Sequence, residues 1–344
     1  MQQVQPHPQQ DEPLQQSTLL RTVAWQNGKL STENPPETWQ AILHDPDALI
    51  WVDILGDSTP QHALLQSVFG LAHITLQTMS EEHERAKFTE QEHYFYMVVH
   101  GMSFDTQTEE AETPKLDIIF GKNFVITAHH ASLPWLDSLL TEAQGENADE
   151  HVMSKGLALL LYTLLDTLVD SYFPILDDID EIIDDLEDVT VNSTSNDVQV
   201  RIFRIKRSLA QMRRTISPQI EVANALMGRT GKFIPAKAQP YFADVHDHLI
   251  RAFEVLDSYR DLMSGMLDVY LTTVSNRLNV IMKQLTILAT IFMPITFITG
   301  VFGQNFGHLP QVEHDNGSLF WITLAAMALI TALQIWYFKK RGWL

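Results

Sequence analysis

Two long apolar segments stand out at the C-terminal end of the chain. The first runs from Leu285 to Phe302 and the second from Leu319 to Phe338, and the loop between them begins Gly303-Gln304-Asn305-Phe306. The eighteen and twenty nearly uncharged residues are each long enough, at about 1.5 Å of rise per residue, to cross a hydrocarbon core of about 30 Å. The pattern predicts an integral membrane protein with two spanning helices.

The segments before the spans follow a different pattern. Residues 1–17 are rich in Gln and Pro, with neither a basic start nor an apolar core, so we expect a disordered tail and no secretory signal. Residues 18–150 mix short β-type runs with helical stretches, which predicts a cytoplasmic α/β domain. Two of these runs, Leu116 to Ile118 and Phe124 to Thr127, are separated by a Gly/Asn turn typical of a hairpin.

Two further helices are expected in this domain, at Pro60 to Phe69 and at Pro134 to Ala143, packed on the sheet. His129 and His130 follow a β run and are expected to be exposed turn residues. The overall fold class is thus an α+β cytoplasmic domain, followed by long stalk helices and two C-terminal transmembrane helices.

Residues 151–240 predict a helical region with one acidic and one basic helix. Apolar residues recur every three or four positions from Leu176 to Val189. Between them lies an acidic row made of Asp177, Asp178, Asp180, Glu181, Asp184, Asp185, Glu187 and Asp188. The row is either a solvated helix face or a surface that concentrates cations near a pore mouth. The basic segment Arg201 to Arg214 follows, and we expect it to neutralise the acidic helix in an antiparallel pair.

One very long helix is expected next, over residues 241–303, because nothing interrupts helix between Pro240 and Pro294. A helix from Tyr241 to Phe302 would be about 90 Å long, so it combines a cytoplasmic stalk with the first span. Residues at heptad-like spacing predict a seam that several copies of the chain would bury: Met263, Leu267, Tyr270, Val274, Leu278, Ile281 and Leu285. The remaining boundaries are 304–318 for the outer loop, 319–338 for the second span and 339–344 for a basic tail.

Charge sets the orientation and limits the function. Lys and Arg flank the spans, whereas the loop between them carries only Glu313 and Asp315, so both termini are expected in the cytoplasm of a protein of the inner (plasma) membrane. A net charge of -20 argues against nucleic acid as a partner and suits a protein that handles cations. The chain has no Cys, no Gly-rich phosphate loop and no His-Glu-x-x-His run, so we expect neither an enzyme nor a resident cofactor.

A second stripe along the first span mixes amide, thioether, hydroxyl and small residues: Asn279, Met282, Thr286, Ala289, Met293, Thr296 and Gly300. A lipid-facing stripe would be uniformly large and apolar, so this one faces a neighbouring helix or water. In the second case a ring of Met282 side chains would form a hydrophobic constriction, and Asn279 and Thr296 would offer oxygens to a hydrated ion.

The sequences around the spans resemble the CorA family of divalent-cation transport proteins. The resemblance rests on SNRLNVIMKQLTILATIFMPITFITGVFGQNF, with its aromatic-Gly-x-Asn motif, and on the C-terminal FKKRGWL. Three upstream segments are similar to stalk and helical-domain sequences of that family: YTLLDTLVDSYF, YFADVHDHL and SGMLDVYLTTVSN. The resemblance therefore covers about residues 80–344. The resemblance implies a funnel-shaped homopentamer that takes up Mg²⁺ down the membrane potential and closes when cytoplasmic Mg²⁺ binds between domains.

The same resemblance implies roles for single residues. Gly303 and Asn305 match the family's outer selectivity motif, with Gln304 between them. Asn279, Met282, Leu285 and Thr296 match pore-lining positions, and the stripe adds Thr286, Met293 and Gly300. Asp244 and Asp166 match regulatory metal positions, with Glu81 or Glu82 as candidates for the carboxylate from a neighbouring subunit.

One departure leaves the ion open. The family motif is usually Gly-Met-Asn, whereas Gln304 stands here, and the zinc-handling ZntB relatives also vary that position. His308 and His314 in the loop, or Asp244, Asp247 and His248 on one helix face, would suit Zn²⁺, Ni²⁺ or Co²⁺ better than Mg²⁺. A Zn²⁺ transporter, with or without proton coupling, and a membrane-anchored sensor that no longer conducts both remain alternatives.

Overall fold

The computed structural model describes residues 19–145, 152–192, 195–229, 231–303 and 318–343. They fall into two compact units. The first contains the residues up to Asp188 together with Gln199–Gly265, and the second contains Val189–Val198 together with Met266 onward.

A seven-stranded sheet with the strand order β2-β1-β3-β9-β8-β5-β4 forms the centre of the first unit. Its strands are β1 (Leu19–Gln26), β2 (Lys29–Ser31), β3 (Leu49–Leu55), β4 (Lys87–Glu90), β5 (Phe95–His100), β8 (Lys115–Phe120) and β9 (Phe124–His129). Only β3 and β9 pair in parallel; the other neighbours are antiparallel. The predicted hairpin is confirmed as β8–β9, and a Cβ at Gly121 in its turn would overlap the ring of Phe124.

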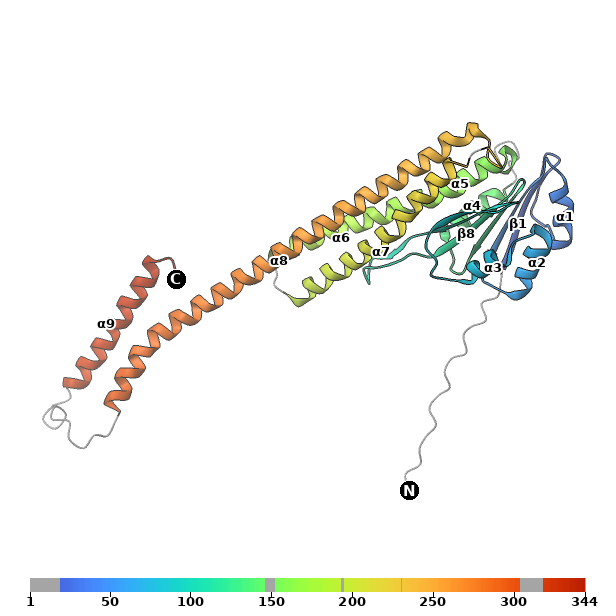
Figure 1. The fold of residues 1–344 in the computed structure, drawn as a ribbon. Helices are drawn as coiled ribbons and strands as arrows, with labels where there is room; N and C mark the ends of the chain where they lie inside the picture. Colours follow the sequence, from blue (N-terminus) through green and yellow to red (C-terminus); the bar gives the residue numbers. More distant parts are fainter. Residues whose placement is uncertain (1–18, 146–151, 193–194, 230, 304–317, 344) are drawn as a thin grey trace, which may run out of the picture. The chain divides into compact units, whose positions relative to one another are not determined.

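Helices cover both faces of the sheet (Figure 1). On one face lie α1 (Pro36–His44), α2 (Thr59–Phe69) and α3 (His73–Ser80), whose apolar residues join a core with alternate residues of the strands. On the other lie α4 (Pro134–Ala143) and α5 (Leu157–Asp170). Central strands covered on both faces need apolar residues on both, which explains why β8 and β9 are buried throughout. The helices predicted at 60–69 and 134–143 are confirmed. The short strands β6 (Ser103–Asp105) and β7 (Glu110–Glu112) form a separate hairpin.

Three longer helices follow, with short 3₁₀ turns at Val152–Lys155 and Ala236–Ala238. They are α6 (Tyr172–Asn192), α7 (Asn196–Met227) and α8 (Gln239–Phe302). Within the first unit α6, α7 and the beginning of α8 run alongside one another (Figure 1). The apolar residues at three- and four-residue spacing in α6 are buried there, as the sequence pattern predicts.

The predicted ion pairing between the basic and the acidic helix is not found for residues 177–187. Arg201 and Arg204 of α7 pair instead with Glu109, whose side chain is buried, and Arg213 pairs with Asp257 of α8. Within the described residues, none of the carboxylates from Asp177 to Glu187 takes part in an ion pair. Arg201, Arg204 and Arg213 of α7 therefore hold the β6–β7 hairpin and α8 rather than the carboxylates from Asp177 to Glu187.

The second unit contains the rest of α8 and α9 (Ser318–Lys340). Three described helical segments are long and apolar enough to cross a membrane. In Leu157–Val191, 44% of the apolar window is buried within the protein, against 6% in Ala236–Phe302 and 0% in Phe320–Lys340. The last two therefore expose their apolar surface as spanning helices do, in agreement with the two predicted spans.

The seam predicted along α8 is only partly available to other copies. Met263 and Tyr270 are buried within a single chain, and the Tyr270 hydroxyl donates a 3.3 Å hydrogen bond to the carbonyl of Ser195. Leu278, Ile281 and Leu285 are exposed. The expectation that partner helices cover the whole seam is therefore wrong for its first part, because the chain's own side chains already cover it.

Candidate functional site

The packing of α9 defines which face of α8 is left open. Gln334 Nε2 donates a 2.9 Å hydrogen bond to the carbonyl of Thr290, and Lys283 Nζ donates a 3.0 Å hydrogen bond to the carbonyl of Gly342. Ile287, between these two levels, is only 8% exposed. Lys283, Ile287 and Thr290 are spaced by four and three residues, so they mark a single face of α8 that meets α9.

The mixed stripe lies on a different face. Its seven members, from Asn279 to Gly300, are all exposed, with Met282 at 65% and Met293 at 72%. At 100° per residue the mean direction of the stripe is roughly 100° around the helix from the face that meets α9, and Asn279 and Thr286 are its members nearest to that face. Part of the stripe borders Gln334 of α9, but packing against the chain's own second span does not explain the members farther around the helix, such as Met282, Thr296 and Gly300.

Details of the stripe bear on ion contact. The Thr286 hydroxyl donates to the carbonyl of Met282 at 2.8 Å, so its oxygen lone pairs remain free to face a cation or water. Thr286, Ala289 and Met293 border a groove of about 390 Å³ that Gln334 closes on one side. Leu285 also lines this groove, at the edge of the stripe.

At the end of α8, the amide of Gly303 donates to the carbonyl of Thr299 at 2.8 Å. A Cβ at Gly303 would come within 3.1 Å of that oxygen, so a residue without a side chain fits the last turn. Gln304, Asn305, His308 and His314 lie outside the described residues, and their proposed roles remain predictions.

The two predicted regulatory aspartates meet around one histidine. His248 Nε2 on α8 lies 3.8 Å from Asp244 Oδ1, and His248 Nδ1 lies 3.9 Å from Asp166 Oδ1 on α5. Asp170, one turn further along α5, places Oδ1 3.6 Å from the same Nδ1. The Tyr162 hydroxyl completes the cluster by donating to Asp244 Oδ2 at 3.2 Å.

The electrostatics of this cluster suit a cation. Burial, and then the neighbouring charge of Asp170, raises the pKa of Asp166 above its usual value. Burial and the carboxylates of Asp166 and Asp244 raise the pKa of Tyr162 to about 12. His248 Nδ1 is buried without a hydrogen-bond partner. A divalent cation between His248, Asp166 and Asp170 would bind that nitrogen and relieve the repulsion between the carboxylates.

The ligand atoms of Asp166, Asp170 and His248 lie within 4.8 Å of one another, and no other such group of three occurs in the part of the chain that the structure describes. Sequence reasoning missed Asp170 and Tyr162, although Tyr162, Asp166 and Asp170 recur at four-residue intervals on α5. Asp247, part of the alternative transition-metal site, is 76% exposed, lies beside His246 and is not in this group.

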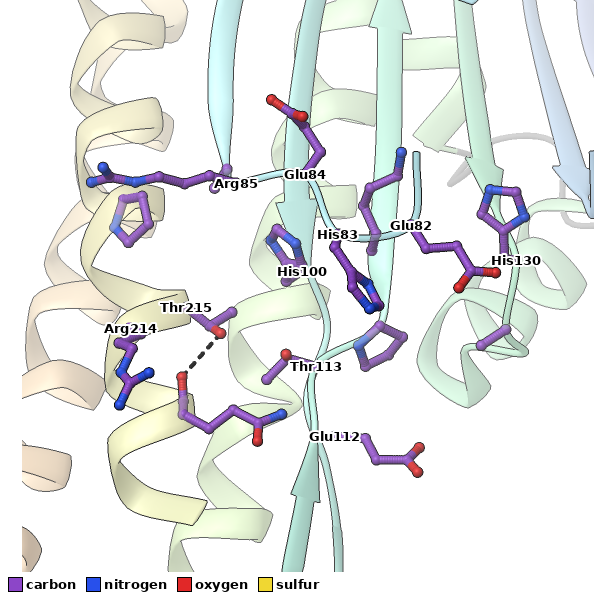
Figure 2. Close-up of a pocket in the computed structure, with 16 residues that line it drawn as sticks. Glu82, His83, Glu84, Arg85, His100, Glu112, Thr113, His130, Arg214 and Thr215 are labelled. Atoms are coloured by element: carbon purple, nitrogen blue, oxygen red, sulfur yellow. Dashed lines mark hydrogen bonds between the residues drawn. The ribbon is translucent and has the colours of Figure 1, made fainter. Parts of the chain in front are cut away.

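Glu82 is not part of this cluster within one chain. It lines a hollow of about 790 Å³ together with side chains from β5, from residues 112–113 and from α7 (Figure 2). Beside it, the buried Lys115 ammonium donates to the carbonyls of Thr78 at 2.8 Å and Glu81 at 2.7 Å, so the main chain after α3 is held in place. A role for Glu81 or Glu82 in a site completed by another subunit remains a prediction.

The histidine pair at the end of β9 makes contacts within the domain. His129 is buried, contrary to the prediction of an exposed turn residue, and its Nε2 lies 3.3 Å from Asp53 Oδ1 while Arg21 binds the other carboxylate oxygen. His130 Nε2 lies 3.1 Å from the carbonyl of Met79, within hydrogen-bonding distance. These contacts connect strands and helices of the domain, and His130 also lines the hollow that contains Glu82.

Comparison with known proteins decides the family. A family model described as "CorA-like Mg2+ transporter protein" matches residues 46–340. The chain belongs to the CorA-like family. It is 34% identical over 303 residues to the cobalt/magnesium transport protein CorA of Thermotoga maritima. The alignment covers 88% of this chain and 85% of that protein. The predicted resemblance is confirmed.

Other relatives are named as transporters of different ions. The zinc transport protein ZntB of Yersinia enterocolitica is 21% identical, covering 82% of this chain and 84% of that protein. Among solved structures, the CorA magnesium transporter from Methanocaldococcus jannaschii superposes with a TM-score of 0.78 at 21% identity, over 95% of this chain and 99% of that one. These relatives are transporters rather than enzymes, and the solved structure shows a shared fold.

Proposed function

We propose that this CorA-like protein is a channel-like transporter that takes up divalent cations, Mg²⁺ first, down the membrane potential. The observation that carries the proposal is the exposed stripe from Asn279 to Gly300, which is centred away from α9 and offers amide, hydroxyl and thioether groups. No Asp, Glu, Lys, Arg or His follows Lys283 in α8, which favours passive conduction over a proton relay.

The proposed assembly is a homopentamer. Its five copies of the chain place this stripe around a central path. The exposed Leu278, Ile281 and Leu285 provide apolar contacts between the copies. Both termini lie in the cytoplasm of a plasma-membrane protein, because Lys and Arg beside membrane spans favour the cytoplasmic side. The driving force is about 2.3 kcal/mol per charge per 100 mV, which doubles for a divalent ion.

Selection occurs at the outer end of α8. Gly303 ends the helix, and rings of Gln304 and Asn305 amides would hold a hydrated Mg²⁺ through its water shell, because Mg²⁺ loses water reluctantly. This role is carried over from the family motif, with Gln304 in place of the usual Met.

Gating depends on the cluster of Asp166, Asp170, Asp244 and His248. Cytoplasmic divalent cation bound there would neutralise carboxylates that otherwise repel one another and would favour the closed state by its tighter binding to that state. The unpartnered His248 Nδ1 and the raised pKa of Asp166 support this assignment.

A second function is Zn²⁺, Co²⁺ or Ni²⁺ transport, with or without proton coupling. The observation that favours it is the imidazole of His248 among the carboxylates, because imidazole suits these ions better than Mg²⁺. The ZntB relatives are in keeping with this alternative.

Flux into proteoliposomes separates these functions. Purified full-length protein would be compared with protein-free vesicles for Mg²⁺ and Zn²⁺ at equal membrane potential, with and without a proton gradient. Mg²⁺ influx that follows voltage and ignores the proton gradient supports the proposal. Zn²⁺ influx accelerated by protons supports the alternative, and absence of both fluxes indicates a non-conducting sensor.

A further inference from the structure

The C-terminal end of α9 is a defined structure. The amide of Trp343 donates to the carbonyl of Phe338 at 2.9 Å, the amide of Gly342 donates to that of Lys339 at 3.2 Å, and Gly342 adopts a left-handed conformation with φ of 66°. This is the hydrogen-bond pattern of a Schellman cap. The ring of Trp343 stacks on Phe338 at 5.8 Å, so the side chains after the last turn have fixed positions.

The first span reaches this cap from α8. Lys283 Nζ donates to the carbonyl of Gly342 at 3.0 Å, and Phe338 and Ile287 are buried beside the contact. The ammonium group retains two further donors after this hydrogen bond. Lys283 is therefore brought to the level of the basic segment Lys339-Lys340-Arg341, and together these four residues form what we call the basic end of the helix pair.

No Asp or Glu side chain lies close in sequence to the basic end. No Asp or Glu occurs from Val269 to Phe302 or from Ser318 to Trp343. Among the described residues, the partners of these cations are a carbonyl and aromatic rings: Lys340 lies 5.2 Å from the Trp336 ring centre and Arg341 lies 5.6 Å from that of Tyr337. Their charges are therefore available to an external anion.

Aromatic residues place the basic end at a membrane surface. Trp336, Tyr337 and Trp343 are all exposed, at the end of a helix that has no buried residue in its apolar window. Trp and Tyr rings at a helix end are typical of the boundary between headgroups and hydrocarbon. An anion that meets these cations there would have its apolar part beside the bare faces of the spans.

We propose that the basic end binds the headgroup phosphate of an anionic phospholipid. Lys283, Lys340 and Arg341 provide charged donors to the phosphate oxygens, and the acyl chains lie along the exposed apolar surface of α9. A phospholipid fits better than a soluble phosphate, because the aromatic rings and the apolar helix surface offer contacts that only the lipid can use. The lipid would hold α8 and α9 together at their basic ends.

Thermal stability of the full-length protein in detergent tests this site. Phosphatidylglycerol, phosphatidylcholine and inorganic phosphate would be titrated separately, and the midpoint of unfolding and the apparent affinity measured. We expect phosphatidylglycerol to raise the midpoint, with phosphatidylcholine and phosphate giving little change. Removing two charges by K340Q/R341Q should weaken the phosphatidylglycerol affinity roughly thirtyfold.

The matched control is K237Q/R207Q, which removes one Lys and one Arg at exposed positions of the first unit. It should bind phosphatidylglycerol like the wild type. K283R, which keeps the charge, should bind well, whereas K283M should not. Equal stabilisation by the two lipids, or equal affinities for K340Q/R341Q and the control, would overturn the proposal. Stabilisation by phosphate to the same extent would assign the site to a soluble anion instead.

Discussion

Gln334 Nε2 on α9 donates a 2.9 Å hydrogen bond to the main-chain carbonyl of Thr290 on α8. The contact lies between two apolar helices and fixes the face that α8 turns to its neighbour. Because the stripe from Asn279 to Gly300 is centred on another face, most of the residues that we propose to line the ion path lie away from this contact, although Gln334 borders Thr286, Ala289 and Met293.

The first prediction concerns this contact. Gln334→Leu should change the unfolding free energy by less than about 1 kcal/mol, because it loses one hydrogen bond but also removes a buried Oε1 that has no partner. Gln334→Glu should be more costly, by about 2–3 kcal/mol, since a carboxylate cannot donate to a carbonyl. Unfolding in increasing SDS would measure both. A Glu variant as stable as the Leu variant would mean that this position faces water, and the assignment of faces would fail.

The regulatory cluster gives a prediction with a control on the neighbouring turn. Asp244→Asn should raise the cytoplasmic Mg²⁺ concentration needed for closure severalfold, because Asp244 contacts both His248 and Tyr162. Asp247→Asn removes the same charge from a side chain that points elsewhere, so its closure should match the wild type. Flux at a series of internal Mg²⁺ concentrations measures this. Equal shifts in both variants would indicate a general charge effect rather than a site.

The pair of His129 and Asp53 makes stability depend on pH. Burial lowers the pKa of His129, but Asp53 and the hydrogen bond to the Ala131 carbonyl outweigh it, so the pKa is raised above its ordinary 6.5. A raised folded-state pKa contributes stability that is complete below about pH 6.5 and is lost as the pH rises through the folded value. The thermal unfolding midpoint of the wild type should therefore decrease as the pH is raised from 6 to 9.

His129→Asn should remove most of that slope and destabilise the protein more at pH 6 than at pH 9. His83→Asn, which changes an exposed histidine, serves as the control and should keep the wild-type slope. Parallel curves for the wild type and His129→Asn would show that His129 is not charged in the folded protein.

Lys115 provides a prediction about the first unit alone. Its buried ammonium is surrounded by three main-chain carbonyls and by Asp117 Oδ2 at 3.0 Å, and burial raises the pKa of Asp117 to about 6. Lys115→Met would leave that carboxylate buried and unpaired, at a cost of about 3–5 kcal/mol. Lys87→Met breaks a partly exposed pair with Glu84 and should cost under about 0.5 kcal/mol. Thermal unfolding compares them; similar midpoints would contradict the importance of the Lys115 site.

Features set by local pattern could be predicted from the sequence. The spans follow from uncharged runs of sufficient length, the β8–β9 hairpin from a Gly/Asn turn between two apolar runs, and the buried face of α6 from its helical spacing. Each depends on residues that are close together in the chain.

Features set by tertiary packing could not be predicted in full. Tyr162 and Asp244 are 82 residues apart in sequence, and only the packing of α5 on α8 brings them within hydrogen-bonding distance. The partner of Arg201 is Glu109 on a distant hairpin, although the acidic row of α6 is nearer in sequence. Surface charges pair with whatever the fold brings near them, so sequence proximity is a poor guide to ion pairs.

The central claim is that cations cross along the face of α8 that carries Met282, and cysteine accessibility tests it most directly. The chain contains no native Cys, so Met282→Cys and Ile287→Cys can be compared without reaction of the reagent at other cysteines of the protein. Mg²⁺ flux would be measured in proteoliposomes before and after treatment with a charged, membrane-impermeant thiol reagent. We predict that flux through Met282→Cys is blocked and that flux through Ile287→Cys, which faces α9, is unchanged. Block of Ile287→Cys with full activity of Met282→Cys would contradict the account.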